Sequence, residues 1–141
     1  MVRASTHLMF QGGANDALAL YASVFPEFRI ETIERHDGNG GTVRMAHVSF
    51  AGHRLVVIDS PIPHAFDFTP SVSLFVDFDT VDAMGRAFDA LGHDGEVLMP
   101  VGAYGFSERF GWITDRFGVS WQLNVPGDGV DPTVADPSQR V

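Results

Sequence analysis

The stretch RFGWITDRFGVSWQLNV, residues 109–125, decides the fold. Large apolar residues alternate with small or polar ones on each side of DRFG, residues 115–118. Alternation with a period of two is typical of β-strands. Asp115 and Gly118 are residues that favour a tight turn. The stretch therefore predicts a β-hairpin.

The expected register of this hairpin separates an apolar face from a mixed face. A four-residue turn places Trp112 opposite Trp121 on one face. That face is strongly apolar, so we expect it to pack under a helix. Ile113 and Gln122 then share the opposite face, which we expect to line a cavity.

Outward from the hairpin, the order β-α-β-β-β appears twice along the chain. Hydrophobic spacing predicts the helices, and alternation predicts the strands. The first set is a strand at 6–11, a helix at 12–25 and strands at 28–36, 42–50 and 53–60. The second set is a strand at 71–78, a helix at 80–95, a short strand at 96–100, and the hairpin after a glycine-rich loop at 101–108.

This repeat predicts an α+β fold. Neither module covers its own sheet, so we expect two paired βαβββ modules to form one curved, cup-shaped mixed sheet with helices outside. We place the first module at 1–62 and the second at 63–126. Residues 127–141 are polar and rich in proline, and we expect a flexible surface tail.

Composition excludes several classes of function. The chain of 141 residues carries 9 Lys and Arg against 18 Asp and Glu, a formal charge of −9. Binding to nucleic acid or an anionic membrane depends on basic side chains, so neither partner is expected. No cysteine is present, which removes thiol nucleophiles and Cys-ligated zinc. No segment has the length of a membrane span, and we expect a cytoplasmic protein.

Three segments together resemble one known family. The segment FGWITDRFGVSWQL at 110–123 resembles the C-terminal signature of the PhnB-like proteins, often labelled 3-demethylubiquinone-9 3-methyltransferase-like. The segments at 6–30 and 59–80 resemble the opening and the middle of the same family. The family is part of the vicinal oxygen chelate superfamily, together with glyoxalase I, extradiol dioxygenases and bleomycin resistance proteins. Phe110 departs from the family, whose members often have Cys there.

The resemblance implies the paired-module fold, a homodimer and a cavity for a small molecule. It does not favour methyl transfer. A nucleoside donor needs a glycine-rich turn after a strand of a parallel sheet. The run FQGGAND at 10–16 lacks that spacing, and the chain is too short for that fold with a substrate domain.

The resemblance also implies four positions for a divalent metal. They fall on His7, on Val57 or Val56, on Ser73 and on Gln122. Only His7 and Gln122 have donor atoms that suit such a metal, and Gln is a weak neutral ligand. Asp59 is on the strand face expected for Val57 and is a substitute. We therefore expect no cofactor and no tightly bound metal; the alternative set is His7, Gln122 and Asp59.

The expected cavity wall mixes polar and apolar side chains, which is the usual chemistry of a small-molecule pocket. Tyr104 is in the glycine-rich loop, which we expect either to cover the pocket or to form a dimer contact. We favour binding of a small, partly aromatic molecule; the alternatives are a metal-dependent lyase, isomerase or dioxygenase of the glyoxalase type, and an interaction protein. The expected ligand-binding residues are His7, Met9, Gln11, Val57, Asp59, Ser73, Phe75, Tyr104, Ile113 and Gln122.

Overall fold

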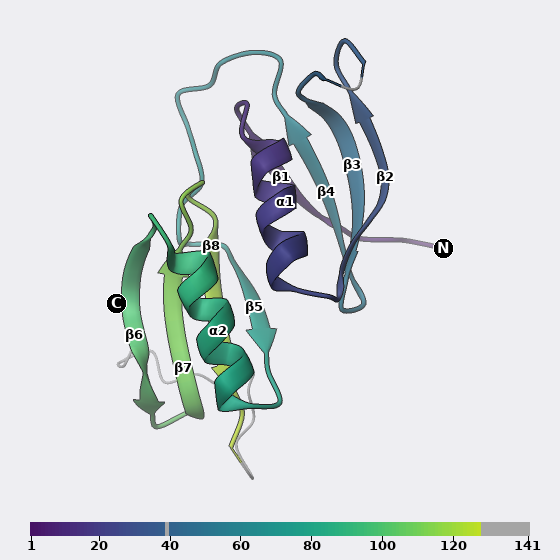
Figure 1. The fold of residues 1–141 in the computed structure, drawn as a ribbon. Helices are drawn as coiled ribbons and strands as arrows, with labels where there is room; N and C mark the ends of the chain where they lie inside the picture. The colour runs from purple at the N-terminus through teal and green to yellow at the C-terminus, as the bar shows by residue number, and fades with distance from the viewer. Residues whose placement is uncertain (39, 128–141) are drawn as a thin grey trace. The chain divides into compact units, whose positions relative to one another are not determined.

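The computed structural model describes residues 1–38 and 40–127. The chain divides into two compact units, Met1–Asp67 and Phe68–Val141. Each unit has the order β-α-β-β-β and one four-stranded mixed sheet (Figure 1). The predicted α+β class and the repeated module are therefore confirmed. The expected tail at 127–141 falls, except for Gly127, outside the described residues.

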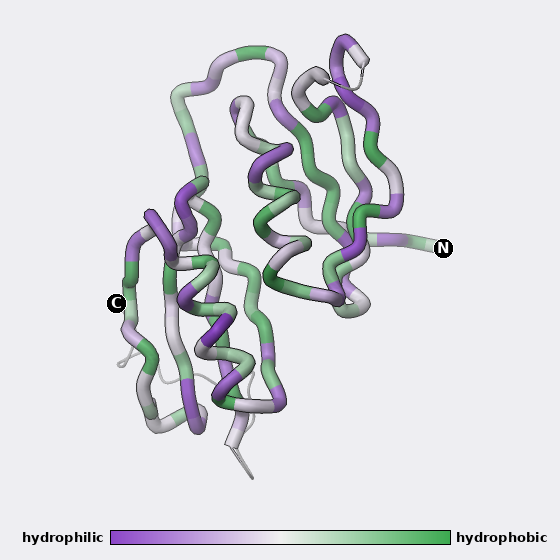
Figure 2. Tube along the Cα trace, in the orientation of Figure 1, coloured by the Kyte–Doolittle hydropathy of each residue, from purple (hydrophilic) through white to green (hydrophobic). Residues whose placement is uncertain are grey.

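The first unit contains the sheet β1-β4-β3-β2 and helix α1. β1 pairs with β4 in parallel, and the other neighbours are antiparallel. Figure 2 shows hydrophobic residues along β4, an inner strand of this sheet. The bounds are β1 Thr6–Phe10, α1 Ala14–Val24, β2 Phe28–Arg35, β3 Val43–Phe50 and β4 His53–Asp59.

Aromatic rings form much of the core between α1 and this sheet. Tyr21 of α1 meets Phe28 edge-on at 5.6 Å between ring centroids. Phe25 follows the helix and lies 4.8 Å from Phe50. All four side chains are buried, so the helix stays on the face of the sheet that carries Phe28 and Phe50.

The second unit repeats this plan with the sheet β5-β8-β7-β6 and helix α2. β5 pairs with β8 in parallel, and β6, β7 and β8 form an antiparallel meander. The bounds are β5 Ser73–Asp77, α2 Val81–Gly92, β6 Glu96–Tyr104, β7 Ser107–Thr114 and β8 Ser120–Val125.

Phe88 of α2 packs on Gly111 of β7. A Cβ atom at residue 111 would lie 2.5 Å from Phe88 Cε2, so the ring packs here because glycine has no side chain. Ile113 of β7 also faces α2, because its side chain is within 4 Å of the Cβ position of Gly92. The helix therefore covers the β7 face that carries residues 111 and 113.

Local signals at the ends of elements are partly confirmed. Thr80 caps α2 as expected, with its Oγ1 accepting from Ala83 N at 3.1 Å. The expected cap of α1 by Asn15 or Asp16 is wrong, because no side chain of the N-cap region supplies that bond. The expected loop at 101–108 is wrong as well: β6 continues to Tyr104, and β7 begins at Ser107.

Candidate functional site

Each sheet has one face under its helix and one face directed away from it, which we call the distal face. The distal faces are the surfaces that can hold a ligand, because the helix-covered faces are closed by the two cores. Side chains alternate between the faces along each strand. Strand register therefore decides which of the expected site residues can act together.

In the first unit, His7 and Met9 lie on the distal face. In the β1–β4 register, His7 pairs with Val56, whereas Leu8 pairs with Val57. Leu8 and Val57 are both buried on the helix side. The expectation that Val57 shares a face with His7 is therefore wrong, and Val56 is the neighbour of His7 on the distal face.

Asp59 also lies on the helix side, where it caps α1 from a distant strand. Its Oδ1 accepts from Gly12 N at 2.8 Å and Ala14 N at 3.0 Å. Its Oδ2 accepts from Val43 N at 2.9 Å. The carboxylate is only 2% exposed. Its proposed place beside His7 as a ligand or metal donor is therefore wrong: three backbone N–H groups already use both of its oxygens.

Gln11 ties the segment after β4 to the end of β1. Its Oε1 accepts from His64 N at 2.9 Å, and its Nε2 donates to Phe66 O at 3.2 Å. His64 stacks on Phe66 at 4.7 Å and shares a hydrogen bond with Ser60 Oγ. The amide of Gln11 is thus engaged in holding this segment.

In the second unit, the hairpin register differs from the expected one by one residue. Thr114 pairs with Ser120, so Ile113 lies opposite Trp121, and Trp112 lies opposite Gln122. The loop is shorter than expected, because Asp115 N still donates to Val119 O at 2.9 Å.

Two features favour the short loop. Gly118 has φ +91, a left-handed conformation that suits glycine. Asp115 Oδ1 accepts from Phe117 N at 2.9 Å and Val119 N at 3.1 Å. Its Oδ2 accepts from Trp121 Nε1 at 2.9 Å. These bonds hold the loop and the start of β8 on one buried carboxylate.

The one-residue shift changes the face of two site candidates. Ile113 lies under α2 with Trp121, so the expectation that Ile113 lines a cavity with Gln122 is wrong. Trp112 takes its place beside Gln122 on the distal face. Ser73 and Phe75 of β5 pair with Ser120 and Gln122 of β8, so they share that face as expected.

A row of hydrogen bonds crosses the distal face of the second sheet. Trp112 Nε1 donates to Ser120 Oγ at 2.8 Å. Ser120 Oγ and Ser73 Oγ are 2.6 Å apart, and Gln122 Nε2 donates to Ser73 Oγ at 3.1 Å. These bonds fix the positions of four side chains. We call them the polar row: Ser73, Trp112, Ser120 and Gln122.

Next to the polar row lies an aromatic cluster made of Phe75, Tyr104, Phe106 and Phe110. Phe110 meets Phe106 edge-on at 4.9 Å and Tyr104 edge-on at 5.9 Å, and Phe75 lies 6.3 Å from Phe110. Tyr104 is held by its hydroxyl, which donates to Pro100 O at 2.7 Å. The ring of Phe75 is 42% exposed.

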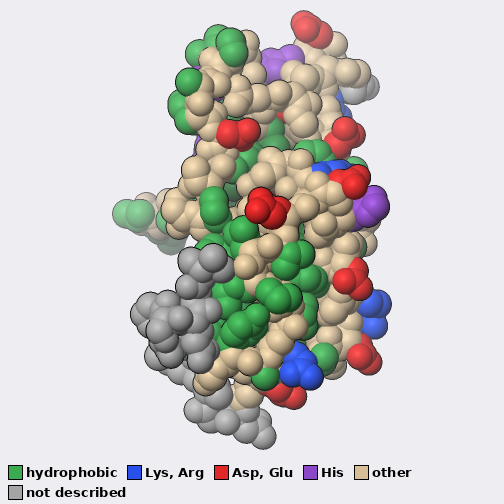
Figure 3. Space-filling model, turned by 90° about the vertical axis from the view of Figure 1, so that its left-hand side faces the viewer, with side chains coloured by type: hydrophobic (Ala, Val, Ile, Leu, Met, Phe, Trp, Pro, Cys, Tyr) green, Lys and Arg blue, Asp and Glu red, His purple; other side chains and the backbone are tan. Residues whose placement is uncertain are grey.

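Exposed apolar side chains occur elsewhere on the second unit as well. Val97 and Val101 of the edge strand β6 are 51% and 39% exposed. Figure 3 shows hydrophobic side chains gathered on this unit. Apolar surface is therefore not confined to the ring of Phe75.

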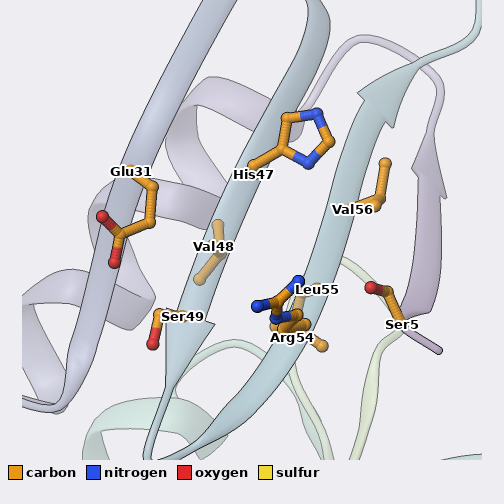
Figure 4. A pocket seen from close by; sticks show the side chains of 8 residues that line it. All are labelled: Ser5, Glu31, His47, Val48, Ser49, Arg54, Leu55 and Val56. Carbon is orange, nitrogen blue, oxygen red and sulfur yellow. The ribbon is translucent and has the colours of Figure 1, made fainter. Parts of the chain in front are cut away.

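A pocket of about 410 Å³ was missed by the sequence reasoning and lies on the distal face of the first sheet. Its ionisable side chains are Glu31, His47 and Arg54 (Figure 4). The tight turn at Ala51 and Gly52 is a signal that could have found it. That turn pairs Ser49 with Arg54 and places both on one face. The full lining is Ser5, Glu31, His47, Val48, Ser49, Arg54, Leu55 and Val56.

Among the described residues, no three His, Cys, Asp or Glu side chains come together in a group that could hold a metal ion. Asp59 is used by the backbone, and the Gln122 amide nitrogen is bound to Ser73. Val56 has no donor atom in its side chain. The four positions that the resemblance implied thus do not fit a divalent metal. In the described part of the chain, no helix is long and apolar enough to cross a membrane.

Two βαβββ units, each with one parallel strand pair, define the class of the protein. A glyoxylase/bleomycin resistance protein/dioxygenase domain from Frankia sp. EAN1pec has the same fold, with a TM-score of 0.66 at 11% identity, covering 90% of this chain and 98% of that chain. The fold is thus that of glyoxylase/bleomycin resistance protein/dioxygenase domains.

Sequence similarity then gives the family. The model of the family described as 3-demethylubiquinone-9 3-methyltransferase matches residues 3–124, and the chain belongs to that family. The PhnB protein from Bacillus cereus is 42% identical with a TM-score of 0.82, over 88% of this chain and 99% of that one. Protein YjdN of Escherichia coli K12 is 25% identical over 138 residues, 86% of this chain and 93% of its own length. The resemblance to PhnB-like proteins is therefore confirmed.

Proposed function

We propose that the protein binds a small, partly aromatic molecule on the distal face of its second sheet, without a tightly bound metal. The observation that carries the proposal is the polar row beside an aromatic cluster. Such sites combine an apolar wall with a few fixed polar groups that orient the ligand. Phe75 supplies an exposed ring on which an aromatic ligand can stack.

The fixed side-chain positions in the polar row support specific rather than non-specific binding of a ligand. Ser73 and Ser120 are held by each other, by Trp112 and by Gln122. A ligand that binds there meets side chains whose positions are already fixed, so it loses less affinity to the ordering of side chains.

The donor set supports binding that does not depend on a metal. His7 and Gln122 alone offer one imidazole and one neutral amide, and Asp59 points into the core of the first unit. Neither described sheet is a doubly wound parallel sheet of the kind that binds a nucleoside donor, which argues against methyl transfer. The homodimer and the cytoplasmic location stay predictions.

The two tryptophans allow a direct test, because they lie on opposite faces of one hairpin. Trp112 is on the distal face, whereas Trp121 is fully buried under α2. We expect indole, catechol or p-hydroxybenzoate to change the tryptophan emission of the wild-type protein. We expect no such change in Trp112→Phe, in which the remaining tryptophan is shielded from the ligand.

A second variant measures the aromatic contact itself. Phe75→Ala removes the exposed ring, and we expect about three- to tenfold weaker binding of the same compound, the range of one aromatic pair. The same emission change in Trp112→Phe as in wild type, or equal affinity in Phe75→Ala, would contradict the proposal. Elemental analysis of protein purified without chelators tests the metal: one divalent ion per chain would contradict that part.

A further inference from the structure

The strongest remaining feature is the pocket on the distal face of the first sheet. All of its lining residues belong to the first unit, between Ser5 and Val56. It shares no residue with the aromatic cluster, and a ligand there goes beyond the proposed function. Its volume of about 410 Å³ is within the range of small-molecule sites.

Strand register brings three ionisable side chains to this pocket. Arg54 of β4 pairs with Ser49 of β3, and His47 lies two residues before Ser49 on the same face. Diagonal neighbours of this kind are about 7–8 Å apart, a distance that long side chains span. An oxyanion between Arg54 and His47 would meet N–H donors from two neighbouring strands.

A β-bulge in β2 supplies the third charge. Ile30 pairs with Val48 and Thr32 with His47, so Glu31 is an extra residue in β2 at this point. A bulge re-aims a side chain that regular pairing would direct elsewhere. Figure 4 shows Glu31, His47 and Arg54 on three successive strands, β2, β3 and β4, and all three line the pocket. Glu31 thus belongs to the same pocket lining as Arg54 and His47.

These charges are not used within the described structure. Over residues 1–38 and 40–127, no hydrogen bond or ion pair is recorded for the side chains of Glu31, His47 and Arg54. Elsewhere on β2 and β3, Glu34 and Arg44 do form an ion pair. An unpaired guanidinium in a molecule with a net charge of −9 is a local site for an anion.

The geometry points to a binding site for a small zwitterion in this pocket. Its carboxylate is held by the Arg54 guanidinium and a ring N–H of His47, and its protonated amine by the Glu31 carboxylate. Guanidinium matches carboxylate geometry with two parallel hydrogen bonds. Ser5 and Ser49 offer hydroxyl groups beside the ligand, and Val56 offers apolar contact for its carbon chain.

A matched set of three probes tests this site. γ-Aminobutyrate carries both charges, butyrate only the negative one, and n-butylamine only the positive one. We expect amide chemical shifts of the isotopically labelled full-length protein to move at residues 47–49 and 54–56. We expect γ-aminobutyrate to bind about fivefold more tightly than either singly charged probe, the effect of one additional exposed ion pair.

Two variants then assign the two charges. Arg54→Gln should abolish the preference for γ-aminobutyrate over n-butylamine and keep the preference over butyrate. Glu31→Gln should do the reverse. Glu34→Gln on β2, the strand of Glu31, and Arg44→Gln on β3, next to the strand of Arg54, are matched controls, because their side chains pair with each other instead. Both controls should bind all three probes as wild type does.

The proposal is overturned if the three probes bind equally or not at all, if the shifts fall outside the pocket, or if both preferences survive in Arg54→Gln and Glu31→Gln. These results are independent of the tryptophan titration. Failure of the zwitterion site leaves the Trp112 response intact, and failure of the aromatic site leaves the amide shifts intact.

Discussion

At the scale of single residues, Asp59 has the largest structural role of the expected site residues. Its carboxylate accepts three backbone hydrogen bonds while being 2% exposed. Those bonds join the start of α1 and the start of β3 to the end of β4. A charged acceptor at a helix N-terminus also interacts favourably with the helix dipole.

We expect Asp59→Asn to lower the free energy of unfolding by about 2–3 kcal/mol, because one acceptor oxygen becomes a donor facing a buried N–H group. Urea unfolding measures the change. Asp16→Asn is the matched control, since Asp16 is exposed in the first turn of α1. It should cost about 0.5 kcal/mol or less. Equal losses in both variants would refute the role given to Asp59.

Asp59 also shows where local sequence rules stop. Capping rules search a few residues around a helix start, and there they indicate Asn15 or Asp16. The actual acceptor is 45 residues further along the chain, on another strand, and bonds to Ala14 N. Its place follows from strand pairing, which no local pattern contains. Thr80, by contrast, is adjacent to its helix and could be predicted.

At the scale of elements, α2 packs closely on β7. A Cβ atom at residue 111 would lie 2.5 Å from Phe88 Cε2 and 3.2 Å from Val101 Cγ2. Two neighbours thus crowd this position. Gly85, within α2, has no atom within 4 Å of its Cβ position. Substitution by alanine therefore meets a crowded site at Gly111 and open space at Gly85.

We expect Gly111→Ala to lower the free energy of unfolding by about 1–3 kcal/mol, the usual cost of overpacking a core. Gly85→Ala should raise it by about 0.5–1 kcal/mol, because alanine loses less backbone entropy in a helix. Thermal unfolding of both variants against wild type measures the changes. A Gly111→Ala variant as stable as wild type would show that α2 moves aside freely.

The hairpin shows why elements are easier to predict than faces. Alternation in residues 109–125 identifies β7 and β8 correctly. Their register depends on whether the loop has three or four residues, and a one-residue error reverses the face of a side chain relative to its partner strand. The bonds of Asp115 and the positive φ of Gly118 decide this. Sequence spacing alone therefore joined Ile113 to Gln122, although Trp112 is the true neighbour.

At the scale of the whole molecule, the repeated βαβββ order was readable because each module has its own complete hydrophobic pattern. The pocket at Arg54 was readable only in part. The turn at Ala51 and Gly52 indicates that Ser49 and Arg54 share a face, whereas the place of Glu31 depends on a bulge in β2. The modules share a plan but not its details. α1 is capped by Asp59 of β4, and α2 is capped by its own Thr80.

The connection between the units is the place to test this division. Along the chain, the boundary between the units falls between Asp67 and Phe68, in a segment outside regular secondary structure. Phe66 is 62% exposed there. The other exposed aromatic side chain in the described residues, Phe75, is protected within β5. Residues 128–141 contain no Phe, Trp, Tyr, Leu or Met. Phe66 is therefore the expected first site for chymotrypsin.

We expect limited chymotrypsin digestion to yield fragments 1–66 and 67–141, with all tryptophan fluorescence in the second. Gln11→Ala should speed the first cut about five- to tenfold, because it removes the two hydrogen bonds that hold the segment to β1. Phe66→Ala should abolish that cut. A Gln11→Ala variant cut at the wild-type rate would show that Gln11 does not hold the segment, which would leave its amide free to serve as part of a ligand site.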